Sequence, residues 1–506
     1  MGQITPVFGS IIPSQQQLLL ANNYLAFNAG ANDFVQQYLP EVYESEVERY
    51  GNRTLNGFLR MVGAELPMTS DQVIWSEQNR LHIAYNNVTQ AGGAASATLT
   101  FVTGGATTVS NAVYPNDTIV VMNPVTGVAV KGIVGRSDNN PALTLATITA
   151  YPFQAQNWDA LTVGATNLKM FVYGSVFAKG TAQGQAQGVT GGAIAAATTV
   201  KSIQPTFTQF ANQPIIIKDS FQINGSDMAQ IGWVDVATED GTSGYLWYLK
   251  SESETRLRFD DYLEMAMVEG ELAAAAVGGA SIRFADQSVG VPGFTIAAGA
   301  AGAHGTQGLF AAITARGNIM AGFSGGTGIS DFDQVLKNLD TQGAIEENML
   351  FLNRDLDLDF DDMLGQISAG IAGGVAYGLF ENSQDMALNL GFSGFRRGSY
   401  DFYKTSWKYL NDASTRGGVA VNNIDGVLIP AGTSTVYDQI LGTNIRRPFL
   451  HVRYRASQTD DRRYKNWITG TAGGAYTSEV DEMVVNWLSE RCLVTQAANN
   501  FVLFQN

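Results

Sequence analysis

The sequence predicts an α+β protein in which a small β domain is inserted into a longer body. Three observations predict this class. A block of short apolar segments lies at about 91–199, Gly-rich stretches flank it on both sides, and a single long helical pattern follows at about 243–276. Short segments at even spacing are typical of the strands of a small barrel or sandwich. The 506 residues are enough for two or three packed domains.

The β block carries the clearest strand signals. Extended segments at 73–84 and 205–221 bracket it, which favours an insertion between two long strands over two consecutive β domains. Flexible linkers are predicted at 91–108 and 180–199. Asn123–Gly127 has the composition of a hairpin turn. The strands themselves are predicted at Thr118–Met122, Val128–Val134, Leu143–Ala150 and Leu168–Lys179.

The segment at 243–276 predicts one long helix. It contains no proline, Ser243 is a candidate N-cap, and the glycine pair at 278–279 follows it. About 30 residues at 1.5 Å each make a rod of roughly 45 Å. Its apolar side is predicted to consist of Leu246, Leu249, Leu257, Leu263 and Val268.

The ends of the chain are less regular. Residues 1–37 are rich in Gln, Asn and Gly and are interpreted as an arm that packs on a partner, and a helical pattern runs from Asp33 to Gly63. In the second half, Ser330 is predicted to cap a helix. Residues 478–488 look helical, and Phe501–Phe504 reads as a buried strand.

Charge is scarce. Only 15% of residues are charged, against roughly 25% in ordinary soluble domains. Interface cores are depleted in charge, so this composition favours a protein that buries much of its outside against partners over a weakly charged enzyme. The net charge of −16 argues against nucleic-acid binding as the main role. No segment is long and apolar enough to predict a membrane span, and the start lacks a signal-peptide pattern.

Candidate catalytic residues are few. The single Cys492 excludes an intramolecular disulfide, and three histidines leave little material for a zinc site or a nucleophile–histidine pair. The alternating Asp355, Asp357 and Asp359 resemble the opening of a calcium loop. An EF-hand needs Gly at the sixth position and Glu at the twelfth, where this chain has Phe360 and Gln366. We therefore interpret the acidic stretch as a solvated strand face ahead of a helix that starts near residue 361, and expect no metal or cofactor.

A basic cluster lies near the C-terminus. It admits two interpretations: pairing with acidic faces of neighbouring subunits, which the acidic chain favours, or an inner surface that touches packaged nucleic acid. Its members are Arg446, Arg447, Arg453, Arg455, Arg462, Arg463 and Lys465.

The order of these elements resembles the major capsid proteins of tailed bacteriophages, which share the Johnson fold. The run from Gly244 to Glu269 looks like the spine helix, and the segments 73–84 and 205–221 look like the two legs of the E-loop. The stretch Leu39–Arg53 is similar to capsid proteins of the crAss-like phages. The resemblance covers nearly the whole chain and rests on architecture, not on a short diagnostic motif.

The resemblance implies a domain map. It comprises an N-terminal arm (1–37), an N-terminal helix region (38–72), an E-loop (73–230) containing the inserted β domain (91–199), a peripheral domain with the spine helix (231–289), an axial domain (290–444) and a C-terminal return (445–506).

The resemblance also implies a function. The chain would form the pentamers and hexamers of an icosahedral head around double-stranded DNA. It would be assembled in the host bacterial cytoplasm with a separate scaffolding protein, a portal and decoration or head-fibre proteins, and DNA would be touched only weakly. No lysine on the excursion is marked as reactive, so a non-covalent shell is expected; the lysines there are Lys131, Lys169, Lys179 and Lys201.

Two alternatives come from other classes. One is a different phage structural protein, a tail sheath or tube, which would need a β-sandwich core without an isolated long helix. The other is a carboxylate-dependent hydrolase that uses Asp355, Asp357 or Asp361. Such an enzyme would need two carboxylates facing each other across a cleft.

Overall fold

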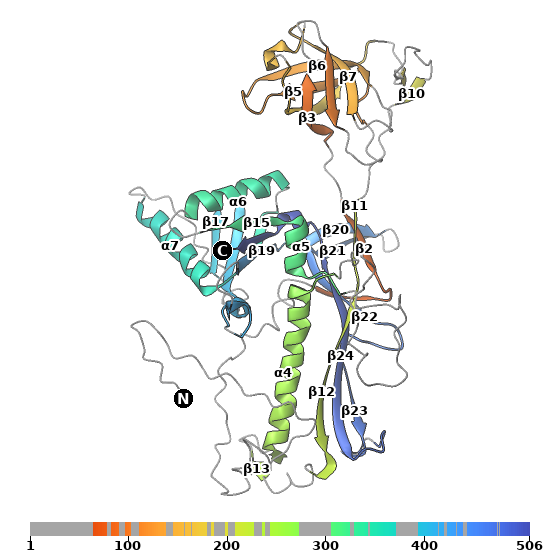
Figure 1. Ribbon diagram of the computed structural model, residues 1–506, viewed down its shortest axis with the longest axis vertical. Coiled ribbons are helices and arrows are strands. Elements are labelled where there is room, and N and C mark those ends of the chain that lie inside the picture. Colours follow the sequence, from red (N-terminus) through yellow and green to blue (C-terminus); the bar gives the residue numbers. More distant parts are fainter. Residues whose placement is uncertain are drawn as a thin grey trace, which may run out of the picture. The chain divides into compact units, whose positions relative to one another are not determined.

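The computed structural model contains two compact units: a barrel unit, Ser76–Gln209, and a body formed by Met1–Trp75 and Phe210–Asn506. Figure 1 shows the elements of both units. The structure describes residues 64–505 except for gaps at 78–81, 91–96, 103–110, 138–144, 156, 163, 180–183, 187–197, 201–207, 227–234, 238–242, 273–304, 324–327, 343–344, 371–392, 413, 419–422, 432, 439–442, 473 and 475. The predicted arm at 1–37 and the helix at 33–63 lie outside the described residues.

The barrel unit contains a closed six-stranded barrel in the order β3-β4-β7-β6-β5-β8. All pairings in it are antiparallel. The strands are β3 (Ala84–Gln90), β4 (Thr98–Val102), β5 (Asp117–Met122), β6 (Ala129–Ser137), β7 (Leu145–Pro152) and β8 (Leu168–Ser175). A short 3₁₀ turn, η3 (Asp159–Leu161), follows β7, and β9 (Gly184–Ala186) pairs with β10 (Thr198–Val200).

The barrel interior is filled by alternate residues of each strand. Ile119 and Val121 of β5 point inward and belong to one buried cluster that also contains Trp158. The Trp158 indole N–H donates to the carbonyl oxygen of Ala150 at 2.8 Å. Gly132 leaves room for this ring, because a Cβ there would lie 2.8 Å from it. The four strands predicted in this block are confirmed as β5 to β8, with ends shifted by up to four residues.

The predicted hairpin at Asn123–Gly127 is confirmed. The amide of Asn123 donates to the carbonyl of Val128 at 2.9 Å, and the Asn123 side-chain oxygen accepts the amide of Val125 at 3.0 Å. Gly127 has a φ of +73°, a conformation that glycine adopts without steric cost.

Two extended segments join the barrel unit to the body. They are β2 (Val73–Glu77) and β11 (Thr208–Asn212), and they pair with each other as a two-stranded ribbon. Both fall within segments predicted to be extended. The chain therefore leaves the body and returns to it through adjacent strands.

The first sheet of the body joins strands far apart in the sequence. Its order is β1-β22-β24-β12, with β23 also pairing with β24. One face packs against the helix α4 (Leu246–Glu269), through a buried cluster in which Phe259 and Leu263 of α4 meet Trp487 of the sheet. In Figure 1 the helix runs alongside β12 and β24. The strands are β1 (Ala64–Met68), β12 (Ile215–Asn224), β22 (Leu450–Arg455), β23 (Lys465–Gly470) and β24 (Glu482–Thr495).

The second sheet of the body has six strands in the order β15-β25-β19-β16-β18-β17. Its strands are β15 (Asn318–Ala321), β16 (Glu347–Leu352), β17 (Ser393–Arg397), β18 (Tyr400–Ser406), β19 (Ile424–Pro430) and β25 (Val502–Gln505). The C-terminal strand β25 lies between β15 and β19. The final residues of the chain thus complete a sheet whose first strand in the sequence, β15, begins 184 residues earlier.

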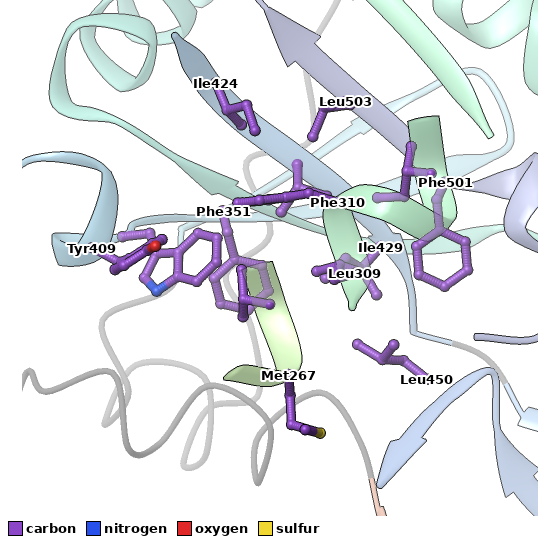
Figure 2. Close-up of a cluster of buried hydrophobic side chains, with 14 of the residues drawn as sticks. Met267, Leu309, Phe310, Phe351, Tyr409, Ile424, Ile429, Leu450, Phe501 and Leu503 are labelled. Carbon is purple, nitrogen blue, oxygen red and sulfur yellow. The ribbon is translucent and has the colours of Figure 1, made fainter. Parts of the chain in front are cut away.

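Side chains on the two faces of this second sheet enter different cores. Leu350 and Leu352 of β16 face the helices α6 (Gly328–Gln342) and α7 (Arg354–Gly370). Phe351, between them, faces the opposite way, toward α5 (Leu309–Arg316) and the end of α4. Figure 2 shows this second core, in which Phe351, Phe310 and Tyr409 converge. The end of the long helix is therefore buried against the second sheet.

Short elements complete the body. They are β13 (Asp235–Ala237) paired with β14 (Ser243–Tyr245), β20 (Thr433–Asp438) paired with β21 (Thr443–Pro448), and the 3₁₀ turns η5 (Lys408–Leu410), η6 (Arg416–Gly418) and η7 (Ala498–Asn500). The predicted α+β content is confirmed.

The long helix is shorter than predicted. It spans 24 residues, or about 36 Å, and not 243–276. Ser243 lies in β14 and does not cap it. The helix ends before Gly270, where the returning chain passes so close that a Cβ would lie 2.6 Å from the carbonyl oxygen of Thr306. Leu257, expected on the apolar side, is exposed, and Phe259 and Met267 are buried instead.

The acidic stretch was wrongly predicted as a strand. Residues 355–362 lie in α7, which begins at Arg354. Asn353 caps it, because its side-chain oxygen accepts the amide of Leu356 at 2.7 Å. Leu356, Phe360 and Met363 are buried at helical spacing. The aspartates therefore occupy the first turns of a helix, where its dipole favours negative charge.

Two further expectations are corrected. The segment 478–488 is not helical, because residues from Glu482 onward form β24, whose Met483, Val485 and Trp487 are buried at strand spacing. Ser330 lies inside α6 and does not cap it, since that helix begins at Gly328. The predicted strand at 501–504 is confirmed as β25.

Candidate functional site

The sequence-predicted carboxylates of α7 form ion pairs. Asp357 is buried and accepts a hydrogen bond from Lys404 Nζ at 2.8 Å, and Arg354 lies 3.2 Å away on its other oxygen. Lys404, almost fully buried on β18, also lies 2.7 Å from Asp361. Asp355 is exposed and Asp359 is partly exposed. The pairing of Asp357 and Asp361 with one lysine joins α7 to the sheet, an arrangement that serves packing.

No cluster suited to a metal stands out in the part of the chain that the structure describes. Within it, no group of three or more His, Cys, Asp or Glu side chains is arranged to hold an ion. Cys492 is buried in the first sheet, and burial raises the pKa of its thiol to about 12. A thiol so protonated is a poor nucleophile at neutral pH.

The root of the barrel excursion is densely hydrogen-bonded. Asn212, at the end of β11, is buried. Its side-chain amide donates to the carbonyl oxygens of Gln307 at 2.9 Å and Leu493 at 2.6 Å. Its side-chain oxygen accepts the amides of Gln307 at 2.8 Å and Gln213 at 2.9 Å and the hydroxyl of Thr306 at 3.2 Å. One side chain thus fixes the returning leg to the segment before α5 and to β24.

A stacked arginine holds the same root from α5. The Arg316 guanidinium lies over the Phe210 ring at 4.2 Å and within 5.6 Å of the Trp75 ring centre. Trp75 belongs to the outgoing leg β2 and Phe210 to the returning leg β11, and their rings lie 6.2 Å apart. Cation–π contacts of this kind contribute about 0.5–2 kcal/mol each. Both legs are therefore attached to one helix of the body.

An arginine–carboxylate network attaches β1 to the C-terminal strands. Glu490 of β24 accepts from Arg455 at 2.6 Å and lies 2.9 Å from Arg462. Arg463 forms an ion pair with Glu65 of β1, and Arg455 also pairs with Asp71. Three members of the predicted basic cluster, Arg455, Arg462 and Arg463, form these ion pairs. Arg455, Arg462 and Arg463 thus have carboxylate partners within the chain, and pairing of the basic cluster with neighbouring subunits stays a prediction.

The end of α4 carries a third polar cluster. Glu269 accepts two hydrogen bonds from the Arg416 guanidinium, both at 2.6 Å, and one from the Tyr409 hydroxyl at 2.6 Å. Burial alone would raise the pKa of Glu269, but the hydrogen bonds from Arg416 and Tyr409 outweigh it and hold the pKa below its usual value. Arg416 also lies over the Phe310 ring at 5.6 Å. The helix end is thereby bound to η5 and η6.

Sequence reasoning missed the root and the Glu269 cluster, and it found only the basic side of the arginine–carboxylate network. Their partners come from segments as far apart as residues 212 and 493, and only folding brings them together. A partial signal was present at the root, because each predicted leg carries one large aromatic residue, Trp75 or Phe210. Arg316, which stacks on both, lies 106 residues after Phe210 and 241 residues after Trp75.

Among the described helices, none combines the length and apolar character needed to cross a membrane. No family model matches the chain, and no curated protein matches it.

Several solved structures are similar to the chain at low scores. One from Mycobacterium phage Bobi is 8% identical with a TM-score of 0.34, over 94% of this chain and 98% of that one. One from Microbacterium phage Oxtober96 is 10% identical with a TM-score of 0.33, over 95% and 99%. One described as the capsid of a native GTA particle is 10% identical with a TM-score of 0.33, over 95% and 98%.

Proposed function

We propose that this chain is a shell subunit, the major capsid protein of a tailed bacteriophage. The observation that carries the proposal is the root: a β excursion leaves a body built on one long helix, returns beside itself, and is fixed to that body by Asn212 and Arg316. A body that stays rigid and an excursion held firmly at its base suit a subunit that reaches over its neighbours.

The described parts fit the Johnson-fold resemblance. In the proposed assignment α4 is the spine helix, the excursion between β2 and β11 is the E-loop with the barrel as its insertion, the first sheet is the peripheral domain and the second sheet is the axial domain. The strands after residue 445 serve both sheets, since β24 lies in the first and β25 in the second. The arm at 1–37 would reach a neighbour.

The physics of a shell accounts for the composition. Each subunit would bury more than a standard interface of about 1,600 Å², and many weak contacts would sum to a stable assembly. Low charge content is expected where so much surface is covered. The proposed product is an icosahedral head of pentamers and hexamers around double-stranded DNA.

The proposed partners are other virion components. They are a separate scaffolding protein, a portal, decoration or head-fibre proteins, and packaged DNA touched weakly on the inner face. Assembly would occur in the cytoplasm of the host bacterium. The segment Leu39–Arg53 supports the narrower proposal of a crAss-like phage. Neither a metal nor a cofactor has a role in this proposal.

The test is electron microscopy with light-scattering mass on the recombinant chain, alone and co-expressed with a scaffolding protein. Rings of five or six, or closed shells, are the expected result. Tubes of fixed diameter would instead indicate a tail protein. A monomer under every condition would overturn the proposal.

A root variant sharpens this test. Replacing Asn212 with Ala removes the bonds that fix the returning leg but leaves the body core intact, so we expect correct folding with markedly less assembly. Asn486→Ala is the matched control, because Asn486 is only partly buried and bonds Thr469 at 3.2 Å within its own sheet. Equal assembly of the two variants would show that the bonds of Asn212 are not needed for shell formation.

A further inference from the structure

The barrel presents an unusual outer face across β7, β6, β5 and β8. Alternation along β5 turns Thr118 and Val120 outward, because their neighbours Ile119 and Val121 fill the interior. Yet these two outward side chains are only 2% and 7% exposed. Side chains on the flanking strands must therefore cover Thr118 and Val120. These two residues form the floor of an outer surface.

The flanking side chains are apolar or aromatic, and two of them are exposed tyrosines. Ile133 pairs with Thr118 on one side and with Tyr151 on the other. Phe171 pairs with Val120, and Tyr173 follows two residues later on β8, where the register of the β5–β8 pair shifts. Tyr151 and Tyr173 are 53% and 50% exposed. The Tyr151 ring lies over Gly135, where a Cβ would approach it to 2.9 Å. We call Thr118, Val120, Lys131, Tyr151, Phe171 and Tyr173 the aromatic face.

The charge of the barrel unit is opposite to that of the body. The unit has six basic residues against four acidic ones, a net charge of +2, whereas the rest of the chain has 24 against 42, a net charge of −18. The basic residues are Arg80, Lys131, Arg136, Lys169, Lys179 and Lys201, and the acidic ones are Glu77, Asp117, Asp138 and Asp159.

The exposed charge on the described barrel is of one sign. Between residues 82 and 179, the exposed charged side chains that the structure describes are Lys131, Arg136, Lys169 and Lys179. Asp117 is fully buried, and its carboxylate accepts the amide of Tyr114 at 2.9 Å. Lys131 pairs across from Val120, and Lys169 across from Met122, so both cations flank the floor.

We propose that the aromatic face is an interaction surface for the acidic body of a second copy of this chain. Exposed aromatic rings supply contact area, and complementary charge selects the partner and its orientation. A weakly cationic barrel would bind an anionic neighbour where two anionic bodies would repel. The inference rests on the proposed shell function and assigns the insertion a role in joining subunits.

Cross-linking tests the contact directly. Cys492 is the only cysteine and is buried, so Tyr173→Cys provides a single accessible thiol for a benzophenone maleimide. Copies with normal and heavy nitrogen are mixed before assembly, and mass spectrometry separates links between copies from links within one. We expect links from position 173 to peptides of the body of the other copy. A label at Val125, 91% exposed at the hairpin tip, is the control and should give a different pattern.

Charge reversal tests the physical cause. We expect Lys131→Glu/Lys169→Glu to lower the yield of that link about tenfold, because like charges then face each other. The matched control is Lys179→Glu/Lys337→Glu, which changes the net charge equally at exposed lysines that are not part of the aromatic face and should keep the link.

The outcomes separate the two proposals. If shells form normally but position 173 links only to other barrels, the aromatic-face proposal is overturned and the shell function stands. The same holds if the link forms equally well in both charge-reversal variants. If heparin protects position 173 of the shells from labelling, the aromatic face would instead be assigned to binding an anionic polymer. A chain that never assembles would overturn both.

Discussion

The barrel and the body differ in how far apart in the sequence their paired strands lie. Two of the pairings among the predicted barrel strands join consecutive strands, β5 with β6 across a short hairpin and β6 with β7, and β8 pairs back with β5 and β3 of the same continuous segment. The body pairs strands from opposite ends of the chain: Ala64 of β1 with His451 of β22, and Ile215 of β12 with Arg491 of β24. A unit made from one continuous segment can be inserted into another fold without changing that fold's strand pairing. The body sheets, by contrast, form only when segments from both ends of the chain come together.

The largest expected effect tests whether the two regions are independent. Trp158→Ala empties the barrel core, and Phe402→Ala empties the core beneath α6 and α7, where Phe402 is fully buried. Each should cost about 3–5 kcal/mol. Because the cores share no residue, we expect calorimetry to show two transitions and each variant to lower only one Tm. A single transition that both variants shift would show that the regions unfold together.

This difference also decides what the sequence could predict. The hairpin at Asn123–Gly127 and the strands around it follow from turn residues and alternation, which act locally. The strand β24 was misread as a helix, although Met483, Val485 and Trp487 alternate, because its neighbours are too distant to mark it as a strand. Helix α7 was misread as a strand because its alternating aspartates hid the helical spacing of Leu356 and Phe360.

The functional clusters were even harder to predict from the sequence. Asn212, Arg316 and Glu269 are ordinary residues in the sequence, and their importance arises mainly from distant partners, such as those of Asn212 that lie 94 to 281 positions away. The predicted basic cluster was a true concentration of charge, but its partners, Glu65 and Glu490, are single carboxylates that no run of sequence singles out.

The next largest effect is expected at the root. Asn212→Ala leaves two backbone carbonyls, two amides and a hydroxyl without their partner, and should lower body stability by about 3 kcal/mol. Denaturant unfolding followed by body tryptophan fluorescence measures this. Asn486→Ala should cost less than about 1 kcal/mol, and the barrel transition should be unchanged in both. A shift of the barrel transition by Asn212→Ala would contradict the separation of the two regions.

A smaller effect depends on pH and belongs to the body alone. The pKa of Glu269 is lowered in the folded state, so its contribution to stability is present above the unfolded pKa of about 4.3 and is lost as the pH falls through the folded pKa. Glu269→Gln should cost about 1.5 kcal/mol at pH 7 and much less at pH 3.

The control for this effect removes the other half of the pair. Arg416→Gln should show the same dependence on pH, and the double variant should be no worse than the more harmful single one, because both act on one interaction. A pH-independent loss in Glu269→Gln would mean that its packing and not its charge stabilises the helix end.

The smallest effect distinguishes charge from stacking at the place where the legs of the excursion meet the body. Arg316→Lys keeps the cation but loses the planar group that lies over Phe210, because an ammonium is a compact point charge. We expect a loss of about 1 kcal/mol, and a double-mutant cycle with Phe210→Leu should return a coupling energy of about 0.5–1 kcal/mol. Additive losses would place the role of Arg316 in its hydrogen bonds to Gln307 and Thr495, and the stacked rings would then be packing partners of the legs alone.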